Sequence, residues 1–93
     1  MPQPPDYTID LSNADAAELD GDQNKNVAWK NTTTSDITLN PPSCVSPGTA
    51  TDIPAGDTSR NFNIRGNKGT TYDYTFDVGA EVGTRNGKIK VNN

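Results

Sequence analysis

"TTYDYTFDVGAEVGTRNGKIKV" (residues 70–91) decides the fold class of this chain. Apolar residues alternate with polar ones on both sides of an interval that contains glycine, at positions Tyr72, Tyr74, Phe76, Val78, Ile89 and Val91. Within each of the two runs, a period of two places the apolar side chains on one face of an extended chain. The segment therefore predicts two β-strands, each with one dry face, joined by a loop.

The same alternation recurs through the rest of the chain. Further strands are predicted within YTIDL, VAWKN, DITLN and TSRNFNI, at residues 7–11, 27–31, 36–40 and 58–64. Stretches rich in proline and glycine separate the later runs and would interrupt a helix. Six one-sided strands with short polar connections predict an all-β fold, a Greek-key β-sandwich of two antiparallel sheets.

One segment, near residues 13–20, is compatible with a short helix. Ser12 or Asn13 is a suitable N-cap, Asp15 favours a first helical turn, and Gly21 is a suitable stop. We expect one or two helical turns there.

Length and composition indicate one folded unit. The chain has 93 residues, of which 30% are hydrophobic, and its mean hydropathy is −0.80. These values are low, but the apolar residues are concentrated on strand faces, which favours folding over disorder. We expect a flexible N-terminal tail at residues 1–5 and a single domain over residues 6–93. The start, MPQPPDY, is interpreted as an initiator Met before a trimmed mature domain, and a secreted or periplasmic location is favoured.

Charge and hydropathy argue against nucleic-acid binding and against a membrane span. The net charge is −4, and residues 1–26 contain six carboxylates against Lys25, or −5, which leaves +1 for the rest. Binding of nucleic acid requires a clustered basic face, which the dispersed Lys and Arg residues do not supply. No apolar stretch approaches the roughly 20 residues that span a bilayer. Neither nucleic-acid binding nor a membrane span is expected.

The order of these elements resembles that of the cupredoxins, the blue copper proteins. Three segments carry the resemblance: VAWKN (an aromatic-x-Asn strand), IPAGDTSRNFNI (a Pro-x-Gly turn before an aromatic strand) and GTTYDYTFDVGAEVGTRNGKIKV (the final two strands and the loop between them). Together they cover roughly residues 27–91. An immunoglobulin-like sandwich is the alternative, with Trp29 as its core tryptophan, but its pair of cysteines is absent.

The departures from the family concern its copper ligands. Cupredoxin sites combine two His, one Cys thiolate and usually a weak axial Met. This chain has no His, and Phe76 stands where the resemblance places the Cys. Asp36 and Ile37 stand where a ligand His is expected, and the ligand loop holds neither His nor Met. The resemblance thus implies a cupredoxin-like domain without a copper site and without a cofactor.

The acidic segment 10–26 offers an alternative metal site. Asp20, Asp22 and Asn24 have the spacing of the first ligands of an EF-hand loop, and hard oxygen ligands suit calcium. The loop glycine and the closing glutamate are replaced by Asn26 and Asn31. A calcium-binding extracellular module is therefore the second hypothesis, and a solvated loop is its alternative.

No catalytic group stands out. A nucleophilic Cys44 would need an activating base, and His is absent. Its PPSCVSPG surroundings predict a turn or an exposed loop, where Cys44 is a half-buried residue without chemistry. The alternatives are an intermolecular disulfide or a modification site. Asp73 and Asp77 are expected on the polar face of their strand. Four aromatic residues could form a binding platform, but their parity favours the core: Tyr7, Trp29, Tyr72 and Tyr74.

The resulting interpretation is a non-catalytic, metal-free, cupredoxin-like module with a binding or structural role. We expect a monomer that contacts a protein partner through residues 41–48 or 78–87, because partner-binding residues concentrate on loops held by a rigid scaffold. The candidate contact residues are Cys44, Val45, Val78, Ala80, Val82 and Arg85.

Overall fold

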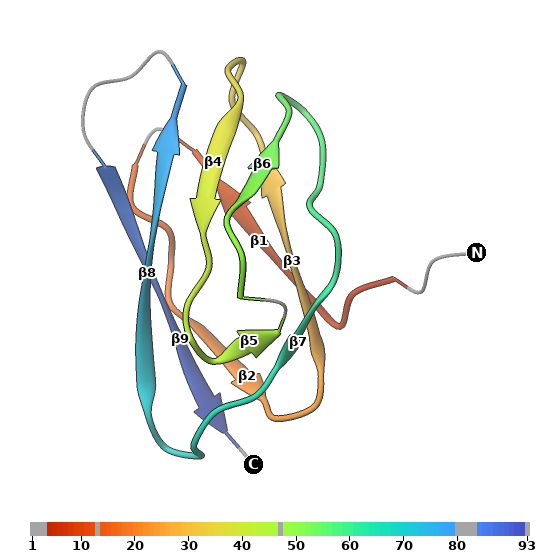
Figure 1. Ribbon diagram of the computed structural model, residues 1–93, viewed down its shortest axis with the longest axis vertical. Helices are drawn as coiled ribbons and strands as arrows, with labels where there is room; N and C mark the ends of the chain where they lie inside the picture. Colours follow the sequence, from red (N-terminus) through yellow and green to blue (C-terminus); the bar gives the residue numbers. More distant parts are fainter. Residues whose placement is uncertain (1–3, 13, 47, 80–83, 93) are drawn as a thin grey trace.

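The computed structural model describes residues 4–12, 14–46, 48–79 and 84–92, and within them the chain forms nine strands and no helix (Figure 1). The strands are β1 (Tyr7–Leu11), β2 (Leu19–Asp22), β3 (Asn26–Asn31), β4 (Ile37–Asn40), β5 (Val45–Ser46), β6 (Thr51–Ile53), β7 (Phe62–Ile64), β8 (Thr71–Val78) and β9 (Thr84–Asn92). Across these ranges no helix is long and apolar enough to cross a membrane.

Two sheets pack face to face, which confirms the all-β sandwich. One sheet has the order β1-β3-β7-β5 and the other has the order β2-β9-β8-β4-β6. The expectation that both sheets are purely antiparallel is wrong, because β1 pairs with β3 in parallel and β2 pairs with β9 in parallel. The chain leaves the first sheet after β1, adds β2 to the second sheet and then returns as β3, a crossover that makes β1 and β3 run the same way.

The expected helix near residues 13–20 is also wrong. Leu19 and Gly21 lie in β2, in register with Ile89 and Val91 of β9. A Cβ on Gly21 would come within 2.7 Å of the side chain of Ile64, so only glycine lets β2 lie this close to the other sheet. Pairing with β9 thus replaces the helix that the local sequence favours.

The segment before β2 bonds to β9 as well. The Ala16 amide donates to the Asn86 carbonyl at 2.9 Å, and the Asn86 amide donates to the Asp15 carboxylate at 3.0 Å. These groups are therefore satisfied by a partner 71 positions away and not by a helical turn.

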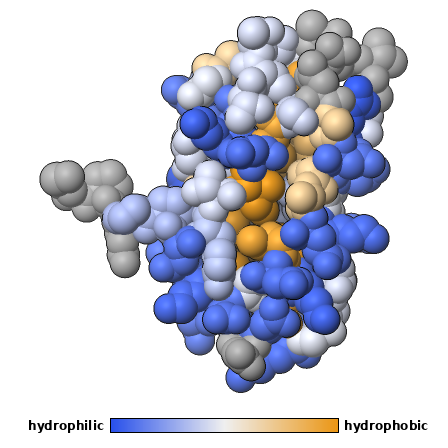
Figure 2. All heavy atoms as spheres, turned by 180° about the vertical axis from the view of Figure 1, so that it is seen from behind, coloured by the Kyte–Doolittle hydropathy of each residue, from blue (hydrophilic) through white to orange (hydrophobic). Residues whose placement is uncertain are grey.

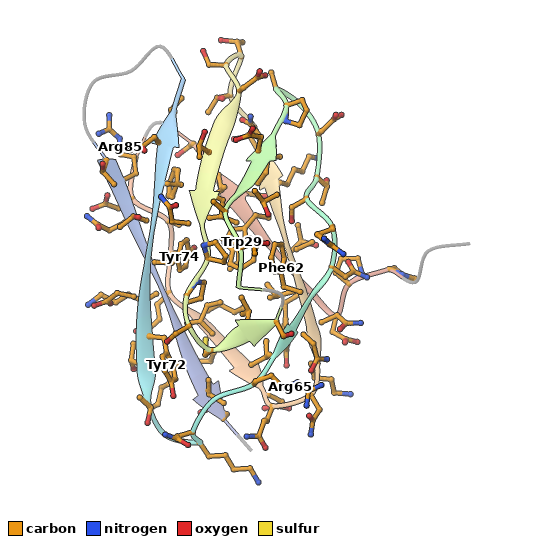
Figure 3. All side chains as sticks on the ribbon, viewed as in Figure 1. Trp29, Phe62, Arg65, Tyr72, Tyr74 and Arg85 are labelled. Carbon is orange, nitrogen blue, oxygen red and sulfur yellow. The ribbon has the colours of Figure 1, made fainter. Side chains whose placement is uncertain are left out.

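The core contains most of the positions that the alternation assigned to it, while Tyr7 and Tyr72 are partly buried and pack against it. The other inward residues are all buried: Ile9, Val27, Trp29, Ile37, Leu39, Phe62, Ile64, Tyr74, Phe76, Ile89 and Val91. At its centre the Trp29 ring meets Phe62 of its own sheet and Tyr74 of the opposite sheet (Figure 3). The centroid of the Trp29 ring is 5.1 Å from that of Phe62 and 5.4 Å from that of Tyr74. Both pairs are edge-to-face, a geometry that aromatic rings prefer.

Tyr74 lies directly opposite Gly87 in the β8–β9 pair. A Cβ on Gly87 would overlap the phenol ring of Tyr74, so the glycine leaves the space that the ring fills. Burial raises the pKa of the Tyr74 phenol. The indole N–H of Trp29 lies beside the phenol and offsets part of the rise in its pKa. The two groups do not meet the geometry of a hydrogen bond.

Candidate functional site

The end of the sandwich where the resemblance places copper is built around Asn31. This side chain is fully buried at the end of β3. Its Nδ2 donates to the Ser35 carbonyl at 2.7 Å and to the Ile53 carbonyl at 2.9 Å, and its Oδ1 accepts from the Thr33 amide at 2.8 Å. One amide side chain therefore holds the β3–β4 loop against the end of β6.

Main-chain bonds close the same end further. The Asn31 amide donates to the Asp57 carbonyl at 2.8 Å, and the Gly56 amide donates to the Asn31 carbonyl at 3.0 Å. Asp36 accepts from the Gly79 amide through its carbonyl at 2.7 Å and from the Ala55 amide through its carboxylate at 3.2 Å. Three loops are thus fixed to one another by hydrogen bonds.

The interior of this end is filled with apolar side chains. Phe76 and Ile37 are fully buried, and Val78 is almost so. Phe76 stands opposite Leu39, and Ile37 stands opposite Val78, in the β4–β8 pair. Among the described residues no group of three or more His, Cys, Asp or Glu side chains could hold a metal ion. The residues at this end, with a phenyl ring where a thiolate would be needed, do not fit copper.

Cys44 is buried, contrary to the expected exposure. Its side chain is fully shielded, and Gly66, with φ +95°, leaves room for the Cys44 Cβ beneath Tyr72. Burial raises the pKa of the Cys44 thiol from 9.0 to about 11. A shielded thiol is not placed to form the intermolecular disulfide without local opening.

We expect Cys44 to resist a thiol reagent such as DTNB in the native protein. The rise of its pKa from 9.0 to about 11 lowers the thiolate fraction near neutral pH about a hundredfold, and burial blocks access as well. Reaction rates measured with and without urea check this. A native rate close to that of the unfolded chain would contradict the burial of Cys44.

The calcium candidates do not form a loop around a common centre. Asp20 and Asp22 lie in the extended strand β2, and Asn24 follows in a turn with φ +72°. The Asp22 amide donates to the Tyr7 phenol oxygen at 3.1 Å, which ties β2 to β1. The EF-hand spacing is therefore not realised as an ion-binding loop, because pairing with β9 extends this segment.

The other candidate contact residues are dispersed by the fold. Val45 and Val78 are buried, and Ala80 and Val82 lie outside the described residues. Arg85 is partly exposed on β9, opposite Phe76, at the end of the sandwich that lies at the top of Figure 3. Of the described candidates, Cys44, Val45 and Val78 are not exposed for contact with a partner.

The aromatic platform is not formed either. Trp29 and Tyr74 belong to the core, and the phenols of Tyr7 and Tyr72 accept hydrogen bonds from the amides of Asp22 and Asn67 at 3.1 and 3.0 Å. Each ring is engaged inside the fold, as the parity of these residues predicted.

A surface that the sequence did not reveal follows the segment 15–19, with β9 on one side of it and β1 on the other, and we call it the β1–β2 groove. It holds two cavities, of about 240 and 250 Å³. The first is lined by Asp15, Ala16, Glu18, Asn86, Gly87 and Lys88, and the second by Thr8, Ile9, Asp10, Ala17, Glu18 and Leu19. Seen from behind, the molecule shows an apolar stripe between two polar margins (Figure 2).

Comparisons with known proteins support the fold. No family model matches the chain, and no curated protein matches it. Two solved structures of amicyanin, a cupredoxin, are similar to it, each at 16% sequence identity over 92% of this chain and 81% of the other. One is a methionine-to-alanine mutant with Cu(I), at a TM-score of 0.55, and the other is the reduced Cu(I) form at pH 4 of a proline-to-glycine mutant, at 0.54.

A likeness at this identity concerns the arrangement of strands and not the activity. The described strands and the two amicyanin structures together confirm the fold that the sequence motifs predicted. The chain is a cupredoxin-like β-sandwich that lacks the copper ligands.

Proposed function

We propose that this chain is a non-catalytic, metal-free binding module that uses the cupredoxin fold as a rigid scaffold for a protein partner. One observation carries the proposal: the end that would hold copper is packed by Phe76 and Ile37 and fixed by the buried Asn31. A hydrogen-bonded end supports a stable scaffold, and its described residues fill their interior with apolar side chains that offer no ligand to an exchangeable metal.

The acidic side chains of β8 support a non-catalytic role. Asp73 lies 3.9 Å from Lys88 in an exposed ion pair, and Asp77 accepts from the Thr84 hydroxyl at 2.8 Å. Both carboxylates lie on the outer face of the sheet, where water surrounds them. A carboxylate pair for acid and base catalysis is normally held in a pocket around the reacting bond.

Added Cu(II) is expected to give neither an intense visible thiolate-to-copper band nor a rise in melting temperature. The physical reason is the absence of His together with the burial of the only thiol. Absorption spectra and thermal melts during a Cu(II) titration measure both quantities.

The matched control is Cys44→Ser. An intense band that disappears in this variant would show that the thiol reaches a copper site, and the metal-free proposal would be wrong. The same melts with Ca²⁺ test the calcium hypothesis, because an ion that binds only the folded chain raises its melting temperature. A rise that Asp20→Asn removes would favour calcium binding.

A further inference from the structure

The β1–β2 groove lies where two sheet edges meet on one side of the sandwich. β1 is the last strand of one sheet and pairs only with β3, while β2 is the last strand of the other and pairs only with β9. The unpaired main-chain groups of an edge strand are a template for an added strand. This side of the molecule therefore offers backbone hydrogen bonds as well as side-chain contacts.

The open edge of β1 faces the groove. The Leu11 carbonyl accepts from Thr32, which follows β3, so the main-chain groups of Leu11 face β3. Because these groups alternate along a strand, those of Thr8 and Asp10 face the open side. Within the described residues no main-chain hydrogen bond joins Thr8 or Asp10 to the segment 14–18, and both residues line the second cavity.

The floor of the groove is apolar, and its cavities are small. Ile9 is 6% exposed, Ala16 and Leu19 are half-buried, and Ala17 is exposed. Sites for drug-sized molecules usually have at least about 300 Å³, more than either cavity offers. Each cavity suits a single apolar side chain, and the second cavity, which β1 lines, is the one that a strand added to β1 can reach.

The margins of the groove are acidic. The exposed residues Asp10, Asp15 and Glu18 line the cavities, against the single cation Lys88. Lys88 forms the one ion pair found among the described residues, with Asp73. Lys30 stands beside Asp10 in the β1–β3 pair but forms no ion pair with it. This charge selects a cationic occupant, and it disfavours a second copy of the chain, which would place like charges together.

We propose that the β1–β2 groove binds an extended cationic segment of a partner protein by strand addition to β1. An apolar side chain of the segment enters the cavity beside β1, and its Lys or Arg side chains meet Asp10 and Glu18. The inference rests on the proposed binding function and names the partner chemistry for it.

The test uses the full chain and an acetylated, amidated octapeptide of alternating valine and lysine. NMR titration is expected to shift the amides of residues 8–10 and 15–19, with an affinity that falls as salt is added. An otherwise identical peptide with glutamate in place of lysine tests the charge requirement. A third peptide, with proline at two central positions, tests strand addition, because proline removes the necessary N–H groups.

Matched variants locate the site. Asp10→Asn combined with Glu18→Gln is expected to weaken the cationic peptide about tenfold or more. Asp52→Asn combined with Asp77→Asn makes the same change of charge on β6 and β8, away from the groove, and is expected to leave the affinity unchanged. Thermal melts of both double variants verify that each remains folded.

Three results would overturn the inference: no saturable binding of the valine–lysine peptide, equal binding of the glutamate peptide, or shifts confined to other parts of the chain. Equal loss of affinity in both double variants would reduce the effect to overall charge and overturn it as well. The copper titration is independent of this groove. A silent copper titration with a failed peptide titration would therefore reject the groove and leave the metal-free scaffold in place.

Discussion

Trp29→Ala is expected to lower the free energy of unfolding by about 3–5 kcal/mol, the usual cost of emptying a large aromatic site. The Trp29 ring is fully buried and touches Phe62 within its sheet and Tyr74 across the interface. Its removal leaves a cavity at the point where the two sheets meet. For a domain of this size, such a loss is a large part of the total stability.

Urea unfolding followed by circular dichroism measures this loss, because the variant has no tryptophan left to report it. Trp29→Phe is the control, since it keeps an aromatic ring between the sheets and should lose less than half as much. The parent protein should show the blue-shifted emission of a shielded indole. Emission typical of water, or an alanine variant as stable as the parent, would place Trp29 on the surface.

Asn31→Ala is expected to cost about 3 kcal/mol of stability although it removes few atoms. The side-chain amide of Asn31 donates to the carbonyls of Ser35 and Ile53 and accepts from the main-chain N–H of Thr33. Alanine leaves these groups without their partner at a buried position, and each unsatisfied buried group costs about 1–3 kcal/mol. Water has partial access to the loop, so we expect the total loss of stability to be smaller than the sum of the costs of the separate groups.

The control is Asn40→Ala, which removes an exposed amide whose hydrogen bond to the Thr75 hydroxyl is long, at 3.5 Å. Its effect should stay within about 0.5 kcal/mol. Both variants are compared by urea unfolding at equal protein concentration. If Asn31→Ala and Asn40→Ala lose the same stability, the hydrogen bonds of Asn31 do not hold the loops together.

The alternating faces could be predicted from the sequence because a period of two is a local property. Phe76 and Ile89 reveal their side of the sheet through their immediate neighbours. β2 could not be predicted in this way. Its four residues, LDGD, hold one aliphatic side chain, and its pairing depends on β9 at the other end of the chain. Without that partner, the local pattern of residues 13–20 favours a helix.

The candidate site was harder to predict because it depends on contacts between distant segments. Prolines around Cys44 indicate a turn correctly, but the burial of its thiol comes from Gly66 and Tyr72. Asn31 could be predicted only as part of a motif, since its partners lie in the β3–β4 loop and at the end of β6. The β1–β2 groove joins three separate segments, and the only local sign of it was the excess of carboxylates in residues 1–26.

The parallel pairing of β2 with β9 has a consequence for synthesis on the ribosome. Leu19 pairs with Ile89, so β2 has no strand to join until residue 89 has been made. Pairings of such long sequence separation form slowly, because the intervening loop must first be closed. Residues 1–26, which contain β2, have a charge of −5. We expect mutual repulsion of these carboxylates to oppose association of nascent chains until β9 is present.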